Sequence, residues 1–199
     1  MKDSQGYVEI RLFKRFLTGD DEAFRALFTR HNDRIYTYSL RIVRSGQIAQ
    51  DVAQETWLRI IDLRTKPPTE EVRNPIGLLI RTARNLSLDY LKSRRRLQPL
   101  DNDGEQERSP SLMPERTLDE EIVLQCLNRI PFEYRETLVL NLYCGYSFEE
   151  IARMLDKSPD AIWARASRAR KRLRELVVAE IEREEQALQL ITRQKTISQ

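Results

Sequence analysis

Two helix-start signals follow each other closely in the segment SFEEIARMLDKSPDAIWARASRARKRLRE at 147–175. Ser147 and Glu150 match the S-x-x-E capping box, in which each side chain bonds a backbone amide at the beginning of a helix. Ser158 and Pro159 then provide a cap and a first residue for a second helix. The segment therefore predicts a short helix, a turn and a longer helix. These elements form either a helix-turn-helix or a helical hairpin with a solvated basic face.

The second of these predicted helices has one apolar side and one basic side. Its apolar side carries Ile162, Ala166 and Ala169 at helical spacing, and residues 165–174 contain six Lys or Arg. Small residues on the opposite side would allow the helix to enter a major groove, where arginine pairs with guanine and other cations neutralise phosphates. The candidate DNA contacts are Trp163, Ala164, Arg165, Ser167, Arg168, Lys171 and Arg172.

Apolar residues spaced by three and four also predict a helical bundle across residues 20–96. One helix begins at a cap at Asp20 or Asp21, and a second runs from about Ile48 to Leu63. A third opens at Asn74-Pro75. The three apolar stripes are Phe24, Leu27, Phe28, His31, Ile35, Tyr38 and Ile42; Ala53, Trp57, Ile60 and Ile61; and Ile76, Leu79, Ile80, Ala83, Leu86 and Tyr90.

The segment between these two helical parts loses all periodicity. Residues 97–116 hold three Pro, one Gly and five acidic residues against two Arg, which gives a local charge of −3 and indicates a flexible tether. We therefore expect an all-α fold of two small helical domains, because the chain is 33% charged with only six Gly. The expected parts are a first domain at 1–96, an acidic linker at 97–116, a helix-turn-helix domain at 117–176 and a charged helical extension at 177–199.

Two surfaces of the first domain carry candidate functional residues. On the second predicted helix, Asp51, Gln54, Glu55 and Leu58 share a face outside the core stripe, which favours an acidic docking surface or a solvated face over an acid–base pair. The third helix carries a cationic ridge with one Asn. The ridge could bind phosphates and the edge of a base, or it could be a helix face that only contacts solvent. The ridge residues are Arg81, Arg84, Asn85, Leu88, Lys92, Arg95 and Arg96.

Other residue patterns exclude several classes of site. Cys126 and Cys144 are isolated and His31 is the only histidine, so neither a disulfide framework nor a metal site is indicated, and no cofactor is expected. No apolar run approaches the ~18 residues that a membrane span requires, and no signal-peptide pattern is present. We expect a cytoplasmic protein without membrane insertion. Its net charge of +3 is too small to predict a partner.

The ordered motifs resemble a known family. DVAQETWLRII at 51–61 and NPIGLLIRTARNLSLDYLKSRRR at 74–96 resemble conserved region two of the extracytoplasmic-function sigma factors of bacteria. LNRIPFEYRETLVLNLYCGYSFEEIARMLDKSPDAIWARASRARKRLRE at 127–175 is similar to their region four. The resemblance implies a subunit that binds core RNA polymerase and directs promoter recognition and DNA melting, without catalytic activity of its own.

This resemblance also implies roles for the candidate surfaces. The face with Asp51, Gln54 and Glu55 would dock on the clamp helices of the largest polymerase subunit, and region four would dock on the flap of the second-largest. The ridge and the loop before its helix would bind and melt the minus-10 element, with Asn85 on an unstacked base of the non-template strand. The linker would thread toward the RNA exit channel. The basic helix would read the minus-35 element, although DAIWAR replaces the usual G-T-V-K-S-R.

The partners implied are duplex and melted promoter DNA, core polymerase and an anti-sigma factor. The extension at 177–199 is longer than region four needs and leaves room for an accessory targeting partner. One alternative is a helix-turn-helix regulator that acts without polymerase, although it would need neither the acidic face nor the Asn-bearing ridge. Another is a nucleic-acid-modifying enzyme, which would need a nucleophile, a metal cluster or a phosphate-binding Gly loop that the motifs do not provide.

Overall fold

The computed structural model describes residues 3–97 and 118–197, without the side chains of residues 3–5, 95, 97, 118, 188 and 190–197. Every regular element within these ranges is helical, which confirms the predicted all-α class. The elements are α1 (Asp3–Leu17), α2 (Asp21–Val43), α3 (Gly46–Asp62), α4 (Pro75–Leu97), α5 (Leu118–Arg129), α6 (Phe132–Leu138), η1 (Val139–Tyr143), α7 (Phe148–Leu155) and α8 (Pro159–Ile197). The predicted acidic linker at 97–116 lies outside the described residues, apart from the last residue of α4.

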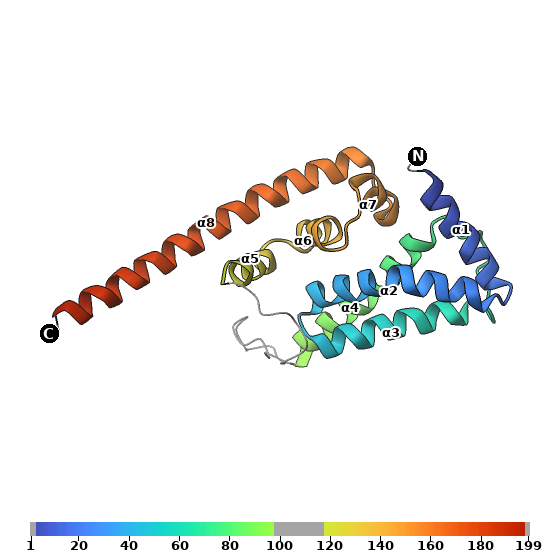
Figure 1. The fold of residues 1–199 in the computed structure, drawn as a ribbon, viewed down its shortest axis with the longest axis horizontal. Coiled ribbons are helices and arrows are strands. Elements are labelled where there is room, and N and C mark those ends of the chain that lie inside the picture. The colour runs from blue at the N-terminus through green and yellow to red at the C-terminus, as the bar shows by residue number, and fades with distance from the viewer. Residues whose placement is uncertain (1–2, 98–117, 198–199) are drawn as a thin grey trace.

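Helices α1 to α4 form the N-terminal unit, in which α2, α3 and α4 pack together (Figure 1). Two of the predicted helix starts are confirmed by their caps. Asp20 accepts a hydrogen bond from the amide of Ala23 at 3.0 Å at the start of α2. Asn74 accepts one from the amide of Gly77 at 2.8 Å, directly before Pro75 opens α4. Each cap satisfies an amide that has no partner inside its helix.

Helix α1 has no counterpart among the predicted helices. Its Phe13 and Phe16 are 2% and 0% exposed, and the Phe16 ring lies 5.5 Å from that of Phe24 in α2. Glu9 of α1 is also buried, and its Oε2 lies 3.2 Å from Nε2 of His31 in α2. The single histidine therefore lies in the core contact between α1 and α2, as its place on an apolar stripe predicted.

The C-terminal unit contains the predicted helix-turn-helix, formed by α7 and α8. Ser147 Oγ accepts from the Glu150 amide at 3.2 Å, and Glu150 Oε2 accepts from the Ser147 amide at 2.7 Å, so the capping box is confirmed. Ser158 Oγ accepts from the amide of Ala161 at 3.2 Å and caps α8. The C-terminal half of α8 projects beyond the rest of the molecule (Figure 1).

Between α6 and α7 the chain departs from regular α-helical geometry. The segment η1 is a π-helical turn, in which the amide of Cys144 donates to the carbonyl of Val139 at 3.1 Å, five residues back. Gly145 follows with a φ of 73°, a conformation that only glycine adopts without strain. This turn places the chain at η1 against α2 of the N-terminal unit.

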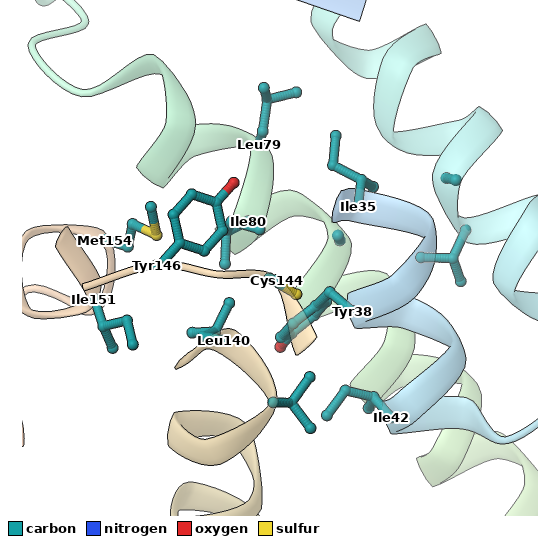
Figure 2. Close-up of a cluster of buried hydrophobic side chains, with 14 of the residues drawn as sticks. Ile35, Tyr38, Ile42, Leu79, Ile80, Leu140, Cys144, Tyr146, Ile151 and Met154 are labelled. Carbon is teal, nitrogen blue, oxygen red and sulfur yellow. The ribbon is translucent and has the colours of Figure 1, made fainter. Parts of the chain in front are cut away.

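The two units share a buried contact that the sequence did not predict. We call it the domain interface; Figure 2 shows its side chains, contributed by α2 and α4 from one unit and by η1, α7 and the segment between them from the other. Each of its labelled residues is at most 4% exposed, so these side chains are as buried as those in the core of either unit. The labelled residues are Ile35, Tyr38, Ile42, Leu79, Ile80, Leu140, Cys144, Tyr146, Ile151 and Met154.

Candidate functional site

The predicted docking face lies on the solvent side of α3. Asp51, Gln54 and Leu58 are exposed and Glu55 is half-buried, while the opposite side of the helix packs into the core. Glu55 accepts from Nε of Arg59 at 2.9 Å, an exposed pair one helical turn apart. The two carboxylates and Leu58 follow one another along one side of α3 rather than converge on a pocket, which suits binding to a basic, partly apolar partner.

The apolar part of this face is larger than the sequence predicted. Phe28 and Ile61 were expected in the core, but they are 40% and 38% exposed, close to the 47% of Leu58. Ile61 lies three residues after Leu58 on α3, so both side chains share one side of the helix. Phe28 packs its ring 5.1 Å from the ring of the buried Trp57. The α2–α3 surface therefore offers exposed apolar area beside the acidic residues.

The cationic ridge of α4 is only partly solvent-facing. Arg81, Asn85, Lys92 and Arg96 are exposed, as predicted, whereas Leu88 is half-buried. The side chain of Arg95 lies outside the described part of the structure. The exposed members share the side of α4 that faces away from the buried Leu79, Ile80 and Ala83.

Arg84 differs from the expectation of a ridge that faces solvent, because its side chain turns toward the C-terminal unit. Its Nε donates to Oε1 of Glu136 in α6 at 2.8 Å, and the Tyr38 hydroxyl donates to the same oxygen at 2.8 Å. Glu136 is 1% exposed and Tyr38 is fully buried. A buried carboxylate thus joins α2, α4 and α6 across the domain interface.

Burial dominates the proton affinity of this cluster. Desolvation raises the pKa of the Glu136 carboxyl above its ordinary value, although the Arg84 guanidinium and the Tyr38 hydroxyl act in the opposite direction. Burial, together with the nearby Glu136 carboxylate, also raises the pKa of Tyr38 far above the range of an exposed phenol. The tyrosine hydroxyl therefore remains a hydrogen-bond donor at neutral pH.

The beginning of the ridge also contacts α7. Nδ2 of Asn74 donates to the carbonyl of Arg153 at 3.1 Å, and Nη1 of Arg81 donates to the carbonyl of Met154 at 3.4 Å. An open pocket adjoins these contacts in the loop before α4. Among its lining residues, Arg81 was a candidate member of the ridge and Asn74 was predicted to start the helix. Its lining residues are Glu70, Glu71, Val72, Arg73, Asn74, Leu78 and Arg81.

On α8, the predicted reading face is exposed from Trp163 to Arg172. Trp163, Ser167, Arg168, Lys171 and Arg172 face solvent, while Ile162, Ala166 and Ala169 are buried beneath them. Ala164 and Arg165 are half-buried. The charge of Arg165 acts to lower the pKa of the Glu136 carboxyl, opposite to the effect of burial.

Within the described residues, no group of three or more His, Cys, Asp or Glu side chains could hold a metal ion. Both cysteines are buried and free. No helix in the described ranges combines the length and the apolar character that a membrane crossing needs. The candidate residues lie instead on the docking face, the ridge and the reading face, most of them exposed.

Two family models match the chain in the order of its two units. Residues 27–97 match the model described as Sigma-70 region 2, which covers α2 to α4. Residues 120–173 match the model described as Sigma-70, region 4, which runs from α5 into α8. The docking face and the ridge fall in the first match, and the reading face falls in the second.

Curated relatives match across both units. The RNA polymerase sigma factor CarQ of Myxococcus xanthus is 33% identical over 167 residues, which cover 82% of this chain and 94% of CarQ. The ECF RNA polymerase sigma factor BldN of Streptomyces coelicolor is 30% identical over 180 residues, which cover 88% of this chain and 68% of BldN.

Solved structures agree on the fold. A chain in the structure of CnrH in complex with the cytosolic domain of CnrY is 23% identical and superposes with a TM-score of 0.65, over 86% of this chain and 98% of that one. A second match is a chain in the structure of the sigma factor RpoE with the anti-sigma factor NepR, from Bartonella quintana. It is 24% identical and superposes with a TM-score of 0.59, over 77% of this chain and 96% of that one. Both sigma regions occur in order, and relatives of 33% and 30% identity match over 82% and 88% of the chain. The chain therefore belongs to the extracytoplasmic-function family of RNA polymerase sigma factors.

Proposed function

We propose that this sigma factor binds core RNA polymerase through α3, opens the minus-10 element with α4 and reads the minus-35 element with α8, without catalytic activity of its own. The observation that carries the proposal is the order of three macromolecule-binding surfaces along a chain whose two units match sigma regions two and four. A regulator that acted without polymerase would have no use for the acidic and apolar face of α3.

The docking face on α3 would contact the clamp helices of the largest polymerase subunit. Asp51, Gln54 and Glu55 supply hydrogen-bond acceptors, and exposed Leu58 supplies an apolar anchor one turn further along α3. Interfaces of this kind concentrate their binding energy in a desolvated apolar centre with a polar rim. The C-terminal unit would make the second contact, on the flap of the second-largest subunit.

The ridge on α4 would hold the melted minus-10 element. Arg81, Lys92 and Arg96 supply positive charge for phosphates, and the exposed amide of Asn85 can bond the edge of an unstacked base. The open pocket in the loop before α4 adjoins Arg81 and offers space for a base out of the stack. Capture of unstacked bases would offset an unpairing cost of a few kcal/mol, so opening would need no ATP.

Binding to a promoter requires the two units to separate. The two promoter elements lie about 25 base pairs apart, which is ~85 Å of stiff duplex at ~3.4 Å per base pair. In the packed arrangement, by contrast, Arg81 of the ridge contacts α7, the helix directly before the reading helix. Residues 98–117 can span at most ~70 Å when extended, and the length of each unit adds to this reach, so the units can part far enough. The packed arrangement is therefore the form of the protein before it binds polymerase and DNA.

A protein partner that holds the packed form would inhibit initiation. The similar chain of RpoE was solved with the anti-sigma factor NepR, and we include a factor of this kind among the partners of this chain. Such a partner would act by stabilising the domain interface, because Arg84 stays bonded to Glu136 while the units remain packed.

The docking face can be tested by substitution. Combined replacement of Gln54 and Glu55 by alanine should weaken binding to core polymerase about tenfold or more, since each ~1.4 kcal/mol of lost contact energy is a factor of ten. The fold should be retained, because both side chains lie outside the core and the Glu55–Arg59 pair is exposed. Affinity is measured by titrating labelled protein with sigma-free core polymerase.

Glu22→Ala is the matched control, because it removes a similarly exposed carboxylate–arginine pair on α2. It should leave the affinity for core unchanged. Equal affinities of the docking-face variant and the wild type would remove α3 from the interface with polymerase. Binding to duplex DNA with no binding to core at all would instead favour a regulator that acts alone.

A further inference from the structure

Trp163 is an exposed aromatic side chain in the first turns of the reading helix. Its side chain is 51% exposed, although the neighbouring Ile162 is fully buried and fixes which side of α8 faces solvent. Ala164 and Ser167 beside it are small. About half of this tryptophan side chain is therefore left in solvent.

The ring is held in place by the other helix of the motif. The rings of Phe148 and Trp163 lie 4.5 Å apart between centroids, at an interplanar angle of 66°. Phe148 is 7% exposed, opens α7 next to the capping residue Ser147, and has the Arg170 guanidinium 5.3 Å from its ring. A side chain braced in this way loses little conformational freedom when it contacts a ligand, so it is prepared for binding.

The surroundings of Trp163 favour DNA over a protein as the ligand. Residues 165–174 carry six cations, and Arg170 and Lys171 of these are exposed on the side of α8 that includes Trp163. A duplex offers phosphates for such cations and, in the same major groove, one apolar group, the C5-methyl of thymine. No other base edge in that groove presents a methyl group.

We propose that Trp163 selects thymine at one position of the upstream promoter element by packing its ring against the C5-methyl group. This inference rests on the proposed function, in which α8 enters the major groove. Ala164 and Ser167 leave room for the backbone of the helix to approach, and Phe148 is a positioning residue that sets the angle of the ring. Recognition at this position would thus depend on an apolar contact.

The test removes the methyl group from the DNA. Promoters are first selected from a library by the holoenzyme, and each thymine of the upstream element is then replaced singly by deoxyuridine, which keeps its base pairing. One replacement should weaken holoenzyme binding about fourfold, the effect of burying one methyl at ~0.8 kcal/mol. The Trp163→Ala protein should bind the thymine and deoxyuridine forms of that site equally. Trp163→Phe should restore part of the difference.

Arg168→Ala is the control, because it should weaken binding and still distinguish thymine from deoxyuridine at the same site. The inference fails if the wild-type holoenzyme tolerates deoxyuridine at every position. It also fails if Trp163→Ala retains the fourfold difference, or if this variant loses only its affinity for a protein partner. A chain that selects no promoter with core polymerase would contradict the proposed function itself.

Discussion

Replacing Glu136 with alanine should lower the free energy of unfolding by about 3 kcal/mol and loosen the contact between the two units. The substitution leaves the fully buried Tyr38 hydroxyl and the Arg84 guanidinium without their shared acceptor. A buried donor without a partner costs ~1–3 kcal/mol, and breaking a buried pair with an ion costs more. Chemical denaturation measures the loss, and Glu133→Ala on the exposed side of α6 is the control.

The pH dependence of the same cluster has a defined sign. Because burial raises the pKa of Glu136 above its ordinary value of 4.5, the folded protein holds this proton more tightly than the unfolded chain does. Stability from this group is therefore complete below pH 4.5 and is lost as the pH rises through the raised pKa. Glu136→Gln removes this loss, so its stability relative to wild type should increase with pH. Equal costs for Glu136→Ala and Glu133→Ala would contradict the assigned role.

Binding to core polymerase should make Cys144 reactive toward an alkylating reagent. In the packed form, burial raises the pKa of the Cys144 thiol to about 12 from its ordinary 9.0, and the side chain is 4% exposed. Separation of the units would restore the ordinary pKa and increase the thiolate population at pH 8 about a thousandfold. The lower nucleophilicity of the weaker base offsets part of this gain, which leaves a rate increase of about fiftyfold.

Cys126 provides an internal control for this labelling experiment. It is fully buried, and burial raises the pKa of its thiol, but it lies on α5 within the C-terminal unit and not in the domain interface. Mass spectrometry of the labelled chain should find modification at Cys144 and not at Cys126 in the holoenzyme. Glu136→Ala should raise Cys144 labelling even without polymerase. Continued protection of Cys144 in the holoenzyme would mean that the units stay packed.

Local chemistry explains why most helix starts could be predicted from the sequence. The caps at Asp20, Asn74 and Ser147 each satisfy a nearby amide, so a few consecutive residues suffice to recognise them. The same holds for the buried side of α8, where Ile162 and Ala166 follow helical spacing. Helix α1 lacks such a signal, since its aromatic residues are buried only by their contact with α2.

The domain interface could not be predicted, because its determinants are far apart in the chain. Tyr38 and Glu136 are 98 residues apart and form one hydrogen bond. In the sequence, Glu136 is one more acidic residue of a charged helix, and Arg84 is one more cation of a ridge. The sequence pattern also placed Phe28 in the core, because helical spacing alone cannot distinguish a wide apolar core stripe from an exposed docking patch. The residues of the three candidate surfaces, by contrast, were chosen from local spacing, and most of those described are exposed.

Transcription in vitro tests the central claim most directly. Sigma-free core polymerase is supplied with a promoter library and nucleotides, with and without this chain. We expect specific transcripts only when the chain is present, and reactive unpaired thymines near the minus-10 element before any nucleotide is added. Failure of the chain to join core polymerase, or a complex with core that opens no promoter, would contradict the account.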